Sequence, residues 1–414
     1  MAMIKRIFPV FFFLLCCSTL WAQDTDQQAV NSTDTVPKAL LVPTPTDSSD
    51  NRLAIALFSP LYLDSAFDAT NTYRYGDEFP RFINPGLEFY EGAMLAIDSL
   101  QKDGLTFDLH IYDTRSKGQA VRQVLKEPDF SKIDLVLGHV NNSEARLLAN
   151  AAAQHSIPFI NVNFPNDAGV KNNPNYVILN STLITHVKAM YAYLQKNHAL
   201  DPITVYTRKG PQEDMFKKYF NDISASTRSV PLKLNFVSLT DQVSAQQLVK
   251  HLNADKRNIS IGASLDINFA QKLAAQFALV NENYPVALFG MPTWDVIDFS
   301  GPEYKNLEIF ISTPFYINPE DPLFVQTENA FKAKYFSRPT DMVFRGFETV
   351  YHFTSLLKKH GSNISSSLGD ASSKIFTALN IQPHLNPNTL VIDYYENKQI
   401  YFIRKVDGEI VGAD

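Results

Sequence analysis

Cysteine is almost absent from this chain of 414 residues, and so is any excess of positive charge. The two cysteines, Cys16 and Cys17, both lie within the first 22 residues. If those residues form a leader that is removed, the product carries no disulfide and no thiolate chemistry. Lysine and arginine number 37 against 43 acidic residues, a net charge of −6. Because a sequence-independent grip on phosphates needs clustered cations, nucleic acid is not an expected partner.

Glycine and proline have no short period, although the chain holds 16 and 23 of them. Collagen-like and low-complexity architectures are therefore excluded for the bulk of the sequence. With 45% hydrophobic and 19% charged residues, the chain is too apolar to be disordered. Its length indicates roughly two to three folded lobes.

Long hydrophobic runs are also missing, because none reaches the roughly 18 to 20 residues of a membrane helix. The longest, 7–17, follows Lys5 and Arg6 and is followed by the small residue Ala22. This pattern is typical of a secretory signal, so we predict a signal peptide at 1–22 and an exported chain without a membrane span. A permanent N-terminal anchor and a lipid-modified cysteine are the alternatives. Lipidation is disfavoured because neither cysteine follows a small residue.

The segment 23–51 is rich in Asp, Ser, Thr, Gln and Pro and has no aromatic residue. Such a segment cannot bury enough surface to order itself, so we predict a disordered tether. From Arg52 onward, short apolar runs alternate with amphipathic stretches of a dozen or more residues, in two series that follow one another. The alternation predicts an α/β fold with two doubly wound parallel sheets. Near the end, 390–395 and 400–406 predict an antiparallel hairpin around Glu396.

Several segments carry a family resemblance, in this order along the chain. They are Ile55–Tyr62, Leu87–Asp98, Tyr112-Asp113-Thr114, Leu137-Gly138 and Arg345–Tyr351. Together they resemble the type I periplasmic binding protein fold, and within it the branched-chain amino-acid receptors of ABC uptake systems.

The resemblance implies a periplasmic protein of two lobes joined by a hinge that the chain crosses three times. Lobe I is then expected to comprise 52–182 plus about 313–385. Lobe II is expected to comprise 183–312 plus about 386–414.

Enzyme motifs are missing. The sequence has no G-x-G-x-x-G, P-loop, G-x-S-x-G or H-E-x-x-H, so phosphate-cradling, serine-nucleophile and zincin chemistry lack their local geometry. The nine histidines are scattered, and His139 and His186 are the two that merit attention for a site built from distant residues. We therefore expect no enzyme, no cofactor and no metal.

The ligand cleft is expected where loops follow the carboxyl ends of parallel strands. In the first lobe this rule selects Tyr62, His139, Asn141, Asn142 and Asn163. Tyr62 either covers a ligand or is a packed surface aromatic. Asn141 lies three residues before a glutamate, so it either caps a helix whose free amides bind a carboxylate or serves only as the cap.

In the second lobe the same rule selects Tyr206, Asp266 and Trp294, and the expected crossing segment adds Tyr316. Asp266 either caps the following helix or meets a ligand ammonium. Tyr316 either lines the cleft or stiffens the hinge. Trp294 is the one tryptophan outside the predicted signal peptide, so it also serves as a fluorescent probe.

Amino-acid receptors of the resembled family place serine and threonine hydroxyls on the first-lobe loops, whereas this chain has His139, Asn141 and Asn163 there. The ligand class is therefore left open among an amino acid, a peptide and a wall-derived compound. The leading hypothesis is an exported, non-enzymatic solute-binding protein that clamps a small polar or amphipathic molecule for uptake or sensing. Its partners would be that molecule and either an ABC permease or an envelope protein. The alternative is a regulatory module of the envelope, such as a peptidoglycan-synthesis regulator, that keeps the fold without a transported ligand.

Overall fold

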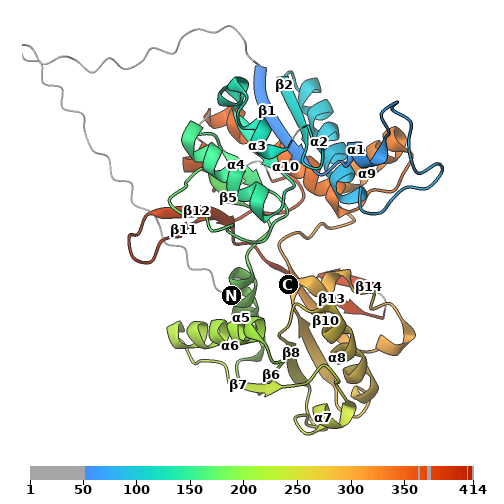
Figure 1. Ribbon diagram of the computed structural model, residues 1–414. Helices are drawn as coiled ribbons and strands as arrows, with labels where there is room; N and C mark the ends of the chain where they lie inside the picture. Colours follow the sequence, from blue (N-terminus) through green and yellow to red (C-terminus); the bar gives the residue numbers. More distant parts are fainter. Residues whose placement is uncertain (1–51, 119, 362–363, 371–373, 408, 413–414) are drawn as a thin grey trace, which may run out of the picture. The chain divides into compact units, whose positions relative to one another are not determined.

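Two seven-stranded sheets organise the part of the chain that the structure describes (Figure 1). The structure is a computed structural model, and it describes residues 52–414 except 119, 362–363, 371–373, 408 and 413–414. The predicted signal peptide (1–22) and tether (23–51) therefore lie outside the described residues. The predicted α/β class, with two wound and mainly parallel sheets, is confirmed.

The first sheet has the strand order β11-β12-β5-β4-β3-β1-β2. Its strands run parallel from β2 to β12, and β11 pairs antiparallel with β12 at the edge. The strands are β1 (Arg52–Ser59), β2 (Thr106–Asp113), β3 (Leu135–Gly138), β4 (Phe159–Asn161), β5 (Tyr176–Ile178), β11 (Ile381–Leu385) and β12 (Ile392–Asn397).

Helices cover both faces of this sheet. Successive side chains of a strand point to opposite faces, so each strand contributes residues to two cores. Ile55 and Leu57 pack into one core with α2, α9 and α10, whereas Ala56 and Phe58 pack into another with α3 and α4. The helices are α1 (Leu63–Ala66), α2 (Asn84–Lys102), α3 (Val121–Val124), α4 (Asn142–His155), α9 (Pro322–Tyr335) and α10 (Asp341–His360), with short 3₁₀ turns at Pro128–Lys132 and Ile364–Ser367.

The second sheet has the order β14-β13-β10-β9-β8-β6-β7. The strands β6 to β10 are parallel, and β13 and β14 add an antiparallel edge. The strands are β6 (Ile203–Thr207), β7 (Leu234–Ser238), β8 (Asn258–Gly262), β9 (Val286–Gly290), β10 (Glu308–Thr313), β13 (Tyr401–Val406) and β14 (Glu409–Gly412). The helices are α5 (Leu183–His198), α6 (Pro211–Ser226), α7 (Ala245–Val249) and α8 (Ile267–Val280), with 3₁₀ turns at Pro292–Val296 and Pro302–Tyr304.

The chain passes between the two sheets at 179–182, at 314–321 and at 398–400. The last crossing corrects two expectations. The strands at 392–397 and 401–406 do not form a hairpin, because β12 pairs with β5 and β11 in the first sheet while β13 pairs with β10 in the second. The expectation that 386–414 belongs to lobe II is therefore wrong for 386–397. A turn-like sequence between two apolar runs does not specify the sheet that each run joins.

Helices α2 and α10 cross at unusually close range, and two glycines permit it. A Cβ at Gly92 would overlap the carbonyl oxygen of Val343, and a Cβ at Gly346 would overlap that of Phe89. The backbones of the two helices are therefore in direct contact. Because each obstacle is a helix backbone, it cannot move aside as a flexible side chain can.

We expect Gly92→Ala and Gly346→Ala each to lower the free energy of unfolding by about 1–3 kcal/mol, the usual cost of overpacking. Urea unfolding followed by circular dichroism measures the change. Gly118→Ala is the matched control, because nothing lies within 4 Å of the position its Cβ would take. Unchanged stability in both helix variants would show that the helices separate freely at this contact.

Candidate functional site

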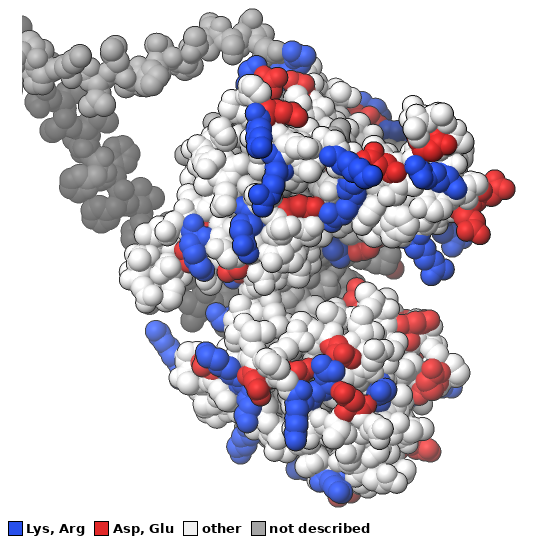
Figure 2. Space-filling view, in the orientation of Figure 1, with Lys and Arg blue, Asp and Glu red and all other residues white. Residues whose placement is uncertain are grey.

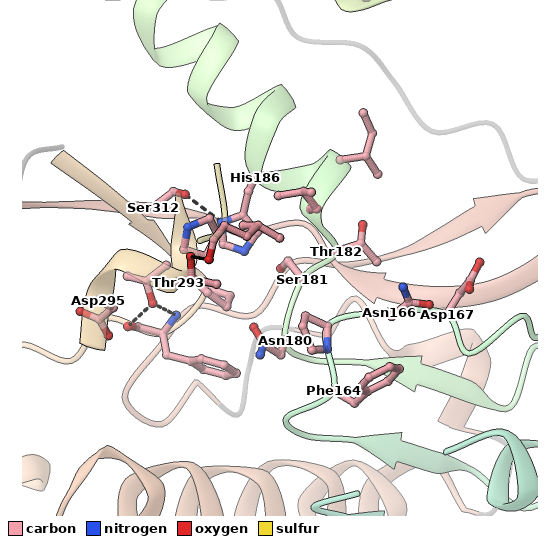
Figure 3. A pocket seen from close by; sticks show the side chains of 18 of the residues that line it. Phe164, Asn166, Asp167, Asn180, Ser181, Thr182, His186, Thr293, Asp295 and Ser312 are labelled. Atoms are coloured by element: carbon pink, nitrogen blue, oxygen red, sulfur yellow. Dashed lines mark hydrogen bonds between the residues drawn. The ribbon is translucent and has the colours of Figure 1, made fainter. Parts of the chain in front are cut away.

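A cavity of about 580 Å³ lies among elements of both sheets and the segments that join them (Figure 3). Its polar and charged lining residues are Asn166, Asp167, Asn180, Ser181, Thr182, His186, Gln212, Thr293, Asp295, Ser312, Thr313 and Arg345. Its apolar lining residues are Phe164, Pro165, Leu183, Ile184, Met215, Tyr219, Leu265, Pro292, Pro314, Phe315 and Tyr394. The cavity thus offers hydrogen-bonding groups and apolar surface together.

Two of the three crossings form part of the cavity wall. Residues 180–182 belong to the first crossing, and residues 312–315 comprise the end of β10 and the start of the second. Part of the wall is therefore built from segments that join the two sheets.

A buried carboxylate joins the first crossing to the third. Glu396, at the end of β12, is fully buried. Its Oε1 accepts hydrogen bonds from the Thr182 amide (2.8 Å), the Thr182 hydroxyl (2.9 Å) and the Thr185 hydroxyl (2.6 Å), and its Oε2 pairs with Lys398. Burial raises the pKa of Glu396, but the charge of Lys398 and these hydrogen bonds outweigh it and hold the pKa below its ordinary value.

The neighbouring residues add further bonds between the same two segments. The Ser181 hydroxyl donates to the carbonyl of Asn397 at 2.6 Å, and the Asn397 amide donates to the carbonyl of Leu179 at 3.4 Å. Ser181 and Thr182 thus line the cavity while their side chains bond to the end of β12, just before the third crossing.

His186 connects helix α5 to the end of β10. Its Nδ1 lies 2.9 Å from the Ser312 hydroxyl, and the two side chains point toward each other in Figure 3. Burial lowers the pKa of His186 to about 4, against the opposing charge of Glu396. The imidazole is therefore neutral near pH 7.

The charged lining residues differ in how well they are paired. Asp167 lies 3.7 Å from the ammonium of Lys171, and Asp295 lies 3.3 Å from that of Lys405. Neither lysine lines the cavity. Arg345 is the one cation among the described lining residues.

None of the nine residues selected from the sequence is among those that line the cavity. In the first lobe, Tyr62 packs edge-on against Phe82, with ring centroids 5.0 Å apart. His139 is 9% exposed beside Phe89, and burial together with two nearby arginines lowers its pKa to about 4. Its ring lies in the core, so the ligand role expected for it is not supported by its position.

The asparagines of the first-lobe loops form local hydrogen bonds. Asn141 caps α4 in a capping box with Glu144, and Asn142 is the first residue of that helix. The Asn163 oxygen accepts a bond of 2.7 Å from the Val140 amide. Asn141 therefore caps the helix, as both alternatives for it require, and the side-chain oxygen of Asn163 fixes the loop after β3.

In the second lobe, Tyr206 and Trp294 are fully buried and do not line the cavity. Trp294 packs over two glycines, and its indole N–H donates to the Ser264 carbonyl at 3.0 Å. Asp266 caps α8 by accepting from the Phe269 amide at 2.7 Å. Tyr316 packs against Tyr401, with ring centroids 5.9 Å apart.

The cavity is lined by the sequence neighbours of these residues. Phe164 follows Asn163, Leu265 precedes Asp266, and Thr293 and Asp295 flank Trp294. The rule that ligands bind beyond the carboxyl ends of parallel strands therefore led to loops that reach the cavity, but the residues it selected are not the ones that line it. Ser181 and Thr182 follow the end of β5, a strand of three residues that the sequence analysis did not single out, and Arg345 lies in α10, where a rule based on strand ends does not apply.

Among the residues described, no cluster of three metal-ligating side chains is found, and no helix is both long and apolar enough to cross a bilayer.

A family model described as periplasmic binding protein matches residues 84–374, more than half of the chain. The chain therefore belongs to the periplasmic binding protein family. No curated protein matches the sequence.

Solved structures share the fold at low sequence identity. A Rhodospirillum rubrum protein assigned as a branched-chain amino acid ABC transporter matches with a TM-score of 0.63 and 13% identity, over 87% of this chain and 99% of that one. A branched-chain amino acid ABC transporter periplasmic ligand-binding protein from Burkholderia xenovorans has a TM-score of 0.58 and 13% identity, over 87% and 92%. An ABC transporter substrate-binding protein from Desulfitobacterium hafniense, in complex with Leu, has a TM-score of 0.53 and 13% identity, over 87% and 99%. The predicted type I fold is thus confirmed.

We expect Glu396→Gln to lower the free energy of unfolding at pH 7 by about 3 kcal/mol, because it removes one member of a buried pair. The folded pKa of Glu396 lies below the value of about 4.3 for an unfolded glutamate. Its ionised form therefore stabilises the fold above about pH 4.3, and this contribution is lost as the pH falls through the folded pKa. The difference in the free energy of unfolding between Glu396→Gln and wild type should therefore become smaller as the pH is lowered.

Urea unfolding at a series of pH values from 7 to 3 tests this. Glu320→Gln, at an exposed residue of the second crossing, is the control and should change little at any pH. A constant difference between Glu396→Gln and wild type across the series would contradict the assigned role of the ionised carboxylate.

Proposed function

We propose that the protein is a solute-binding protein that holds a small amphipathic molecule in the cavity beside its crossings. The cavity of about 580 Å³ carries the proposal, since it lies within the range of about 300–1,000 Å³ that is typical of ligand sites. Membership of the periplasmic binding protein family supports it, because the fold places a ligand between two wound sheets.

The lining favours a ligand with one polar end and one apolar end. Phe164, Met215 and Tyr219 supply apolar surface, while Asn180 and Gln212 supply amide groups. Amino acids and short peptides combine these properties. The leucine bound to the structural neighbour from Desulfitobacterium hafniense is a molecule of this kind.

We propose binding without catalysis. The pair of Ser312 and His186 has the composition of a nucleophile and a base, but Ser312 is 1% exposed and His186 is 2% exposed. A histidine whose pKa is lowered to about 4 is a weak base near pH 7. The pair is better explained as a polar contact between α5 and β10.

Export and a membrane partner complete the proposal. The predicted signal peptide would deliver the chain to the periplasm, where the loaded protein would present its ligand to an ABC permease or to a sensor. The envelope module without a ligand is the alternative that the next experiment separates from binding.

We expect the chain from Arg52 onward, refolded to remove bound molecules, to be stabilised by at least one class among amino acids, short peptides and wall fragments. A ligand at 100 times its Kd adds about 2.7 kcal/mol to the free energy of unfolding. Thermal unfolding measures the shift, and Trp294 emission reports the change beside the cavity, because Thr293 and Asp295 line it.

The variant Gln212→Trp should abolish the shift, because it fills the cavity from an exposed position of α6. Asn221→Trp is the matched control, since it lies exposed on the same helix and does not line the cavity. If no class stabilises the wild type, or if Gln212→Trp still responds fully, the proposed site is wrong. In the first case the envelope module becomes the better interpretation.

A further inference from the structure

Arg345 is an unusual residue of the cavity wall. It lies in α10, its side chain is 18% exposed, and its guanidinium carbon lies 4.0 Å from the ring centroid of Phe315. Stacking on an aromatic face holds a guanidinium in one plane and leaves its edge available for hydrogen bonds. Both residues line the cavity.

The hydrogen-bond donors of Arg345 are only partly used. Nη2 lies 2.7 Å from a carboxylate oxygen of Asp341, whose side chain is 60% exposed. Nε is buried and has no partner among the residues described. A guanidinium has five N–H donors, so one contact to an exposed carboxylate leaves most of its capacity unused.

The other charges of the cavity do not neutralise this arginine. Asp167 and Asp295 have lysines of their own. Burial lowers the pKa of Arg345, and the opposing charges of Asp341, Asp295 and Glu348 do not restore it. Glu348 is itself engaged by the backbone amides of Phe376 and Thr377. A partly buried cation that is incompletely compensated favours an incoming anion.

We propose that Arg345 anchors the carboxylate of the ligand, while the apolar body of the ligand lies against Phe164, Met215 and Tyr219. This inference rests on the proposed function and narrows it to small monocarboxylates, including amino acids. A planar carboxylate matches the edge of a stacked guanidinium. A dianion is disfavoured because Asp167 and Asp295 also line the cavity.

The test compares each acid with its own primary amide, which has nearly the same shape and no negative charge. The panel is the amino acids, short peptides and branched or aromatic monocarboxylates, each with its amide, together with neutral sugars. Calorimetry on the chain from Arg52 onward measures Kd. We expect the acids that bind to do so about 10- to 100-fold more tightly than their amides, as is typical of a hydrogen bond to a charged group.

Two variants locate the anchor. Arg345→Gln should remove the preference for acid over amide, whereas Arg338→Gln, at an exposed arginine outside the cavity, should keep it. Asp341→Asn leaves Arg345 in place and removes its competing carboxylate, so it should tighten binding of the acids by several-fold. The Asp341 variant keeps the inference testable if Arg345→Gln fails to fold.

The outcomes separate this inference from the proposed function. Loss of the acid preference in Arg345→Gln together with tighter binding in Asp341→Asn would support it. If acids and amides bind alike, if neutral sugars bind best, or if Arg345→Gln keeps the preference, the carboxylate anchor is wrong although the protein still binds a solute. If no member of the panel binds the wild type, the proposed function fails and the anchor fails with it.

Discussion

One buried carboxylate ties together segments that lead from one sheet to the other. Glu396 is the next-to-last residue of β12, the strand from which the chain leaves the first sheet for the last time, and it accepts hydrogen bonds from the first crossing and from the start of α5. A buried carboxylate is unfavourable unless both its charge and its lone pairs are matched. Lys398 matches the charge, and Thr182 and Thr185 match the lone pairs. The carboxylate of Glu396 therefore connects Thr182 in the first crossing with Lys398 in the third.

The cavity lies beside these crossings. The short crossings bury backbone groups that have no neighbouring strand to pair with. Hydroxyl and amide side chains of the crossings and of adjacent residues supply hydrogen bonds to these groups instead. Ser181 and Thr182 line the cavity, yet their side chains are engaged with the end of β12, and the Thr313 hydroxyl bonds to the Phe315 carbonyl. Much of the polar wall therefore serves the hinge. Arg345 differs because it comes from a helix and retains donors that the hinge does not need.

The order of strands and helices was predictable, whereas the side chains of the site were not. The loops after β4, β8 and β9 do reach the cavity, as winding implies, but they present Phe164, Leu265 and Thr293 to it. The polar neighbours chosen from the sequence are used by the loops themselves, as Asp266 shows by capping α8. Capping and ligand binding use the same chemical groups, so a polar residue at a strand end does not reveal which role it has.

The sequence by itself determined the alternation of strand and helix, the two wound sheets and the family resemblance. Hydrophobic periodicity is a local property, so it can be recognised from the residues of each element alone. Only the tertiary structure decided that 392–397 joins the first sheet and 401–406 the second, and that Arg345 meets Phe315 beside a cavity. These contacts join residues far apart along the chain. Several segments have local sequences that suit the same position in a sheet, and packing and the compensation of buried charge decide which segment takes it.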